Sequence, residues 1–252
     1  MPYGPTRCLN DGPSRRSSIL LLTALSLFCA PIGMGLTPSD ARAADTSYEP
    51  MLQWMRLQKE QIATRLSSAT DRGMRDSLLA RASDVILSGI VDSILPRWVG
   101  TEWSYNGTTR APGTGSIACG YLVTTVLKDA GFELPRVKFA QVPSEVMIRR
   151  MVKNQDVRRF SDYAIDRFVR VMREWGQGIY IVGLDYHVGF LIVSDSTTVF
   201  CHSSFFAPKE VVWENAEESW ILAQSRYRVA GRFLPNRDIV RAWLTGYEFT
   251  ID

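Results

Sequence analysis

The sequence predicts an α+β protein in which helical segments precede a compact block of strands. Residues 48–96 and 135–177 carry apolar side chains mostly at helical spacing. A further amphipathic helix begins at or just before Cys119. Residues 178–204 instead read as three short strands separated by turns. Helices and strands are therefore segregated along the chain, which is typical of the α+β class.

Length and charge suit an ordinary folded protein. The 252 residues are enough for one large domain, or for one domain with an accessory helical piece. The formal net charge is +3, and no basic run alternates with aromatic residues. We therefore expect no nucleic-acid partner.

The first 43 residues have the order of a secretory signal peptide. Arg15 and Arg16 precede an apolar run from Ile19 to Ala30, and an A-x-A cleavage pattern ends at Ala43. The apolar run is shorter than the roughly 20 residues that span a membrane. We therefore expect an exported protein, periplasmic or secreted, with no transmembrane segment in the mature chain.

Two features of this segment bear on the alternatives to a signal peptide, which are a membrane anchor and a lipoprotein. Pro31 follows the apolar run, which argues against a membrane anchor. Cys29 raises the possibility of a lipoprotein, but Phe28 before it is larger than the residue such sites prefer. A lipoprotein is therefore the less favoured interpretation.

Residues 44–97 are predicted to form an N-terminal helical segment without chemistry of its own. The expected break between two helices is Asp71 to Gly73, and Pro96 is expected to end the second helix. We expect this segment to pack on the main domain or on a partner.

The helix at Cys119 is the centre of the functional prediction. Ser116 is its expected N-cap and Gly131 its C-cap. Its apolar stripe lies on the same face as the cysteine (Leu122, Val123, Val126, Leu127 and Ala130). A thiol in the first turn lies at the positive end of the helix dipole, which favours the thiolate. The alternative use of Cys119 is as a small buried core residue.

After signal removal the mature chain keeps Cys119 and Cys201. In an exported protein these two could form a disulfide, or Cys119 could be a free nucleophile. The sequence leaves both possibilities open.

Two segments flank this helix. The Gly- and Pro-rich segment from Trp98 to Gly115 contains Trp103 and Tyr105, and is expected to be either one wall of a cleft or a packed aromatic turn. Residues 140–177 are predicted to be a helical insertion rich in arginine. Acidic residues are interleaved with these arginines, so a solvated helix face is the favoured interpretation there.

The only two histidines of the chain, His187 and His202, lie in the strand block. With a four-residue turn at 194–197, Val193 pairs with Thr198, and the two histidines then share one face. The sequence therefore predicts two imidazoles within reach of each other at the edge of a sheet.

These residue types suit acyl transfer. Cys119 would be the nucleophile, His187 the general base and acid, and His202 the group that orients His187. The backbone N–H of Cys119 and a donor from the loop around Tyr105 would stabilise the oxyanion, with Trp103 and Gly120 as further substrate or oxyanion residues. A Cys/His/His zinc site is the competing use, but it lacks close spacing such as C-x-x-C, so no metal is predicted.

The order of these motifs resembles the NlpC-type, papain-like cell-wall cysteine peptidases. The resemblance rests on the cysteine at a helix start, on His-Val-Gly-Phe-Leu-Ile-Val at 187–193 and on Val-Phe-Cys-His-Ser-Ser at 199–204, and it covers residues 98–234. Tyr227 to Leu234 resembles the closing strand of that domain. It implies a papain-like core, a catalytic helix packed on a small antiparallel sheet or barrel, within residues 98–252, and a reaction that needs no cofactor.

The chain departs from the family pattern at the nucleophile. The usual Asp-Cys-Ser reads Ala118-Cys119-Gly120, and Trp103 stands where the family tyrosine would be. We expect an exported enzyme that hydrolyses an amide in a peptidoglycan stem or another peptide through a thioester. The alternatives are an amidase or acyl-transfer enzyme acting on a protein or lipid, and a non-catalytic binding module. Residues 236–252 are expected to add a short helix and a packed tail.

Overall fold

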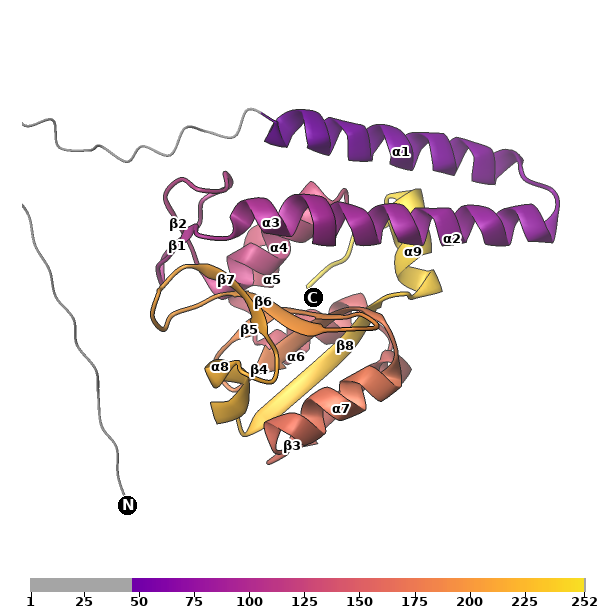
Figure 1. The fold of residues 1–252 in the computed structure, drawn as a ribbon. Helices are drawn as coiled ribbons and strands as arrows, with labels where there is room; N and C mark the ends of the chain where they lie inside the picture. Colours follow the sequence, from indigo (N-terminus) through magenta and orange to yellow (C-terminus); the bar gives the residue numbers. More distant parts are fainter. Residues whose placement is uncertain (1–46, 252) are drawn as a thin grey trace, which may run out of the picture. The chain divides into compact units, whose positions relative to one another are not determined.

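The computed structural model describes residues 47–251 of the chain. The expected signal peptide at 1–43, with Cys8, Cys29 and the cleavage site at Ala43, lies outside the described residues. Residues 47–251 combine helices with an antiparallel sheet, so the α+β prediction is confirmed (Figure 1).

A six-stranded antiparallel sheet forms the centre of the fold, with strand order β3-β8-β4-β5-β6-β7. Its strands are β3 (Val157–Ser161), β4 (Gly178–Leu184), β5 (Val188–Val193), β6 (Thr198–Ser203), β7 (Val211–Asn215) and β8 (Tyr227–Leu234). The three strands predicted between 178 and 204 are β4, β5 and β6. Val193 pairs with Thr198, so the predicted register is confirmed.

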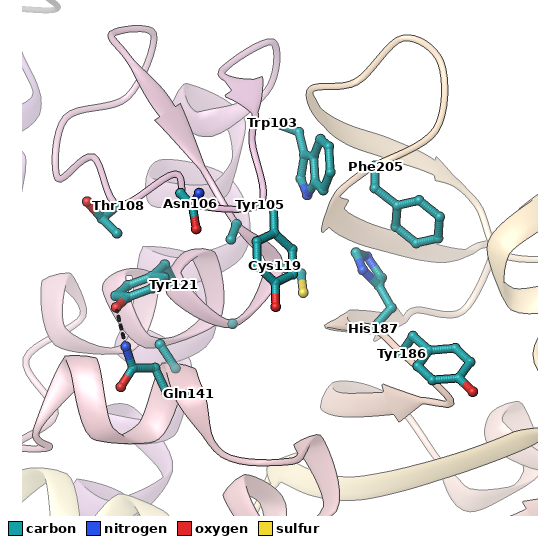
Figure 2. Close-up of a pocket in the computed structure, with 13 residues that line it drawn as sticks. Trp103, Tyr105, Asn106, Thr108, Cys119, Tyr121, Gln141, Tyr186, His187 and Phe205 are labelled. Atoms are coloured by element: carbon teal, nitrogen blue, oxygen red, sulfur yellow. Dashed lines mark hydrogen bonds between the residues drawn. The ribbon is translucent and has the colours of Figure 1, made fainter.

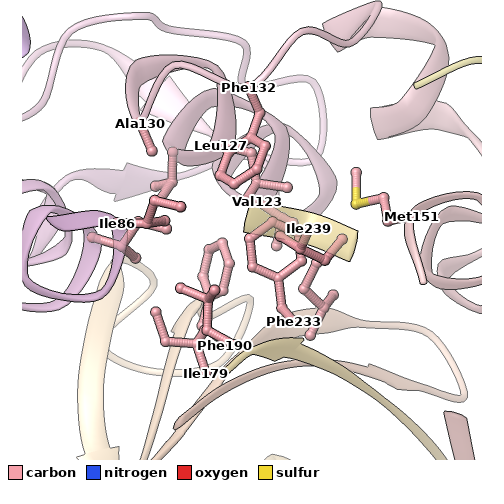
Figure 3. Close-up of a cluster of buried hydrophobic side chains, with 14 of the residues drawn as sticks. Ile86, Val123, Leu127, Ala130, Phe132, Met151, Ile179, Phe190, Phe233 and Ile239 are labelled. Carbon is pink, nitrogen blue, oxygen red and sulfur yellow. The ribbon is translucent and has the colours of Figure 1, made fainter. Parts of the chain in front are cut away.

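The two faces of the sheet bury different layers of helices, because alternate side chains of each strand point to opposite faces. One face packs on α4 (Cys119–Asp129), α6 (Ser144–Met151) and α9 (Arg237–Thr245). Figure 3 shows this core, in which Phe190 and Phe233 of the sheet lie below Val123 and Leu127 of α4. The other face packs on α7 (Ile165–Trp175) and α8 (Trp220–Gln224).

The N-terminal helices belong to the first of these cores. They are α1 (Tyr48–Ser68), α2 (Arg72–Ser88), a π-helical turn (Gly89–Ile94) and α3 (Leu95–Trp98). The expected break is found, with Asp71 accepting the amide of Met74 as the N-cap of α2. Pro96, expected to end the helix, instead lies near the start of α3, which continues directly from the π-helical turn and ends at Trp98.

The predicted helical insertion at 140–177 is wrong in part. It contains the end of α5 (Arg136–Gln141), α6, a short 3₁₀ turn (Asn154–Asp156), β3 and α7. The strand β3 pairs along its whole length with β8 at the sheet edge. The buried residues of β3, Val157 and Phe160, are three positions apart, which is also the spacing of a helix. The sequence pattern therefore does not reveal that β3 pairs with β8.

The C-terminal predictions are confirmed. Tyr227–Leu234 is a strand, Arg237–Thr245 is a short helix, and Phe249 of the tail is buried in the core. Over the described residues 47–251, none of the helices is long and apolar enough to cross a membrane.

Candidate active site

The helix α4 begins at Cys119 itself. Its N-cap is Ala118, in an extended conformation, and not Ser116 as expected. Ser116 belongs to a two-residue strand, β2 (Ser116–Ile117), which pairs in parallel with β1 (Glu102–Trp103). Because Ser116 is held in this pairing, the chain stays extended up to Ala118, and the cysteine enters the first turn of the helix.

Two hydrogen bonds hold the segment before the helix, one to the sheet and one to the loop at Gly107. The hydroxyl of Ser203, at the end of β6, donates to the carbonyl of Ile117 at 2.6 Å. The amide of Ala118 donates to the carbonyl of Gly107 at 2.9 Å. Cys119 is thereby held beside strand β6, although the two segments are more than 80 residues apart.

A cavity of 730 Å³ opens at this junction. Figure 2 shows the sulfur of Cys119 and the imidazole of His187 on opposite walls of it. Five aromatic side chains line the cavity: Trp103, Tyr105, Tyr121, Tyr186 and Phe205. Within the described part of the chain, no Asp, Glu, Lys or Arg side chain lines it. The cavity therefore suits an uncharged part of a ligand.

The two histidines meet as the register predicted. Nε2 of His187 lies 2.8 Å from Nδ1 of His202, and both rings are buried. Gly189 makes room for this pair, since a Cβ there would lie 2.7 Å from Cβ of His202 and 2.7 Å from Cζ of Phe200. The imidazole of His202 also stacks on the ring of Phe200.

Glu214 extends the pair into a chain of three groups. Its Oε1 lies 3.1 Å from Nε2 of His202. Burial acts against the carboxylate, but hydrogen bonds from His202 and Ser219 hold the pKa of Glu214 below its usual range. An ionised carboxylate can only accept, so Nε2 of His202 carries the hydrogen and Nδ1 of neutral His202 accepts from Nε2–H of His187.

This order of hydrogen bonds determines the free nitrogen of His187. With its hydrogen on Nε2, neutral His187 has a lone pair on Nδ1. Nδ1 is buried and has no hydrogen-bond partner. Nδ1 of His187 therefore makes no hydrogen bond to the thiol of Cys119, and its lone pair stays unshared.

The expected thiolate is also corrected. Burial raises the pKa of the Cys119 thiol, although hydrogen bonds from the backbone of Val188, Gly120 and Cys119 itself act in the opposite direction. Burial and the neighbouring His202 lower the pKa of His187 well below its usual value. Desolvation outweighs the helix dipole here, so the site at neutral pH holds a protonated thiol and a neutral imidazole.

The other predicted residues lie around the same cavity. Trp103 lines the cavity and packs against Phe205, and Tyr105 is 82% exposed at its mouth. Gly120 lies so close to α5 that a Cβ would be 2.4 Å from the carbonyl oxygen of Ala140.

The second oxyanion donor expected from the loop around Tyr105 stays a prediction. The loop amides of Trp103 and Gly107 already donate to the carbonyls of Lys209 and Ser104. The backbone of Val188, at the start of β5, bonds the thiol instead. The amide donors at the sulfur thus come from the helix start and from the sheet, and not from the loop around Tyr105.

Cys119 and Cys201 are both free, so the disulfide that the sequence left open is not formed. Cys201 is fully buried in the core, and burial raises the pKa of its thiol. Among residues 47–251, no cluster of three or more His, Cys, Asp and Glu side chains has the arrangement of a metal site.

Sequence reasoning missed Glu214 and the aromatic residues Tyr121, Tyr186 and Phe205. The strand β7, which carries Glu214, was not predicted. Val211-Val212-Trp213 directly before Glu214 is a strand signal that was present in the sequence. Tyr186 follows Asp185 in the turn before β5, and nothing in that pair of residues alone indicates a cavity wall.

Comparisons with known proteins give no relative. No family model, curated protein or solved structure matches this chain. A function for this protein must therefore be argued from the arrangement of Cys119, His187, His202 and Glu214.

Proposed function

We propose that this protein is an exported cysteine hydrolase that cleaves an amide bond through a thioester on Cys119. The observation that carries the proposal is the unpartnered Nδ1 of His187, a residue that lines the same cavity as Cys119 and whose other ring nitrogen is hydrogen-bonded to the His202–Glu214 pair. A buried ring nitrogen with no hydrogen-bond partner is rare in a folded protein unless a ligand or reaction uses it.

The reaction begins with a proton transfer, because the resting thiol is protonated. As the sulfur attacks the carbonyl carbon, the proton of Cys119 passes to Nδ1 of His187, and the carbonyl π electrons move to the oxygen. The backbone amides near the sulfur, those of Cys119, Gly120 and Val188, are the candidate donors to the oxyanion. Glu214, through His202, stabilises the positive charge that forms on His187.

The second half of the reaction restores the enzyme. When the tetrahedral intermediate collapses, the C–N bond breaks and His187 gives its proton to the leaving nitrogen, which leaves a thioester on Cys119. A water molecule then attacks this thioester while His187 takes its proton. The C–S bond breaks, the acid is released, and the proton returns to the sulfur.

The substrate we favour is a peptide, including the stem peptides of peptidoglycan. The resemblance of the Cys119, His187 and His202 segments to papain-like cell-wall peptidases supports this class, as does the expected export signal. A papain-like core with α4 as its catalytic helix agrees with the packing of α4 on β5 and β6.

The proposal is tested with an activated ester, p-nitrophenyl acetate. We expect a burst of p-nitrophenol and an acetyl group on Cys119, located by mass spectrometry of the digested protein. Cys201 is a matched internal control, because it is fully buried and should stay unmodified. Cys119→Ser and His187→Ala should abolish or strongly reduce the burst.

The result that contradicts the proposal is equal acetylation of Cys119 in the wild type and in His187→Ala. That result would favour a non-catalytic binding module. If the burst is found, digestion of purified peptidoglycan, followed by the appearance of new amino groups, tests the substrate.

A second candidate is acyl transfer to a protein or lipid. The uncharged, aromatic lining of the cavity favours it, because an apolar acceptor could exclude water from the thioester. The two candidates differ in how the acetyl group leaves Cys119. Hydrolysis releases acetate at a rate that does not depend on an added acceptor, whereas acyl transfer becomes faster when an acceptor is added.

A further inference from the structure

Two grooves on either side of α9 are lined with basic side chains, at a place separate from the Cys119 cavity. The groove between α6 and α9 has a volume of 480 Å³ and is lined by Arg149, Arg150, Lys153 and Arg241. The groove between α2 and α9 has a volume of 410 Å³ and is lined by Arg72, Arg75, Arg237 and, again, Arg241. Since Arg241 lines both, the two grooves are neighbours around one helix.

The charge of these grooves is strongly one-sided. Two acidic side chains line them, Asp76 and Asp238. Asp76 pairs with Arg72 and Arg237, and Asp238 pairs with Lys153 and, at 3.9 Å, with Arg241. Seven cations and two carboxylates line the two grooves, so cations are in excess there.

The acids that the sequence places among the arginines of the middle segment lie elsewhere. Glu145 binds Arg159 and Tyr227, and Asp162 binds Arg226. Asp156 lies at the rim, bonded to Asn236, and does not line either groove. Two arginines of that segment, Arg149 and Arg150, line a groove, whereas Arg159 and Arg170 pair with the interleaved acids Glu145 and Asp166.

We propose that these grooves bind a linear chain of phosphate groups. Six of the seven cations are arginines, whose planar guanidinium groups match the paired oxygens of a phosphate. Two adjacent concavities fit an extended polyanion better than a flat lipid surface. Nucleic acid is disfavoured because stacking of bases needs successive exposed rings, and Tyr247 is the one exposed ring in the grooves, with its neighbour Phe249 buried.

The test uses linear polyphosphate as the probe, titrated into the full mature protein at several salt concentrations. We expect the logarithm of the affinity to fall linearly with the logarithm of the salt concentration, as counterions are released. The double variant Arg75→Gln/Arg149→Gln removes one exposed arginine from each groove. It should weaken binding at least tenfold and reduce the salt slope by about two, one for each arginine–phosphate pair removed.

The matched control removes the same charge elsewhere. Arg170 and Arg226 are exposed and lie outside both grooves, so Arg170→Gln/Arg226→Gln should bind polyphosphate like the wild type. Circular dichroism and thermal melting of both double variants establish that each is folded.

Three results would overturn the proposal. Equal weakening in both double variants would show a response to net charge alone. Inorganic phosphate binding as tightly as the polymer would show that no chain is recognised. Tighter binding of a single-stranded oligonucleotide or of anionic phospholipid vesicles than of polyphosphate would assign the grooves to that other class of ligand.

Discussion

At the scale of single residues, Glu214 determines which nitrogen of His187 can accept a proton. Glu214 and His187 do not touch each other. Glu214 acts on His187 by setting the tautomer of His202, which is hydrogen-bonded to both. Each hydrogen bond in this chain has one possible direction once the carboxylate is ionised. These hydrogen-bond directions leave Nδ1 of His187 without a hydrogen.

Replacing Glu214 tests this relay. Glu214→Ala should lower kcat roughly 10- to 100-fold with little change in KM, because the residue positions His187 and does not contact the substrate. Glu214→Gln keeps an oxygen acceptor for Nε2–H of His202 and should retain more activity than alanine. In the wild type, ¹⁵N NMR should find Nδ1 of His187 unprotonated; a protonated Nδ1 would contradict the relay.

The pH dependence of activity follows from the pKa of His187. The folded protein lowers this pKa below its usual value of 6.5, so the neutral base persists as the pH falls through that value. Activity, measured as kcat/KM, should therefore be lost only well below pH 6.5. The alkaline limb should lie above pH 9.0, since burial raises the pKa of Cys119 from that value. An acid limb at or above pH 6.5 would contradict this electrostatic description.

At the scale of elements, a buried polar contact ties α1 to α4. The hydroxyl of Tyr48 donates to Oδ2 of Asp129 at 2.6 Å, and Nε1–H of Trp98 donates to the same hydroxyl at 2.9 Å. Burial raises the pKa of Asp129 from 3.8 to about 6. This contact holds the N-terminal helix on the helix that carries Cys119.

The raised pKa of Asp129 makes this contact pH-dependent. A carboxyl with a raised pKa stabilises the fold fully below pH 3.8, and this contribution is lost as the pH rises through about 6. Asp129→Asn keeps an acceptor for Tyr48 and cannot ionise. It should exceed the wild type in free energy of unfolding at pH 7 by about 1–3 kcal/mol, and the excess should disappear near pH 4. Urea unfolding at both pH values measures this, and an equal difference at both would exclude the titration of Asp129 as its cause.

At the scale of the whole molecule, the N-terminal helices and the sheet share one core. Leu52, Met55 and Ile62 of α1 belong to the same cluster of buried side chains as Phe190 and Phe233 of the sheet. The described residues 47–251 accordingly lie within one compact unit. The helical segment is therefore part of the fold that positions Cys119.

A shared core should unfold as a unit. Ile62 is 2% exposed, so Ile62→Ala should cost about 2–5 kcal/mol of unfolding free energy. Tryptophan fluorescence and far-ultraviolet circular dichroism should report one coincident transition in urea for both proteins. Two separate transitions, of which only the first shifts in the variant, would mean that α1 and α2 unfold independently.

The sequence by itself determined the elements whose patterns are local. The helix at Cys119 follows from its apolar stripe, and the pairing of β5 with β6 follows from a four-residue turn that allows one register. That register was enough to predict that His187 and His202 meet, because side chains on neighbouring strands at matched positions lie close together.

Only the tertiary structure decided what depends on burial and on contacts distant in the sequence. The protonated thiol of Cys119 results from desolvation, which no spacing pattern encodes. Glu214 joins the site through the pairing of β7 with β6, and β3 becomes a strand because β8 offers it an edge. The basic grooves arise because α2, α6 and α9 come together and bring seven cations but two carboxylates to the grooves around α9. Local patterns specify the backbone of each element, whereas charge and proton positions depend on everything packed around it.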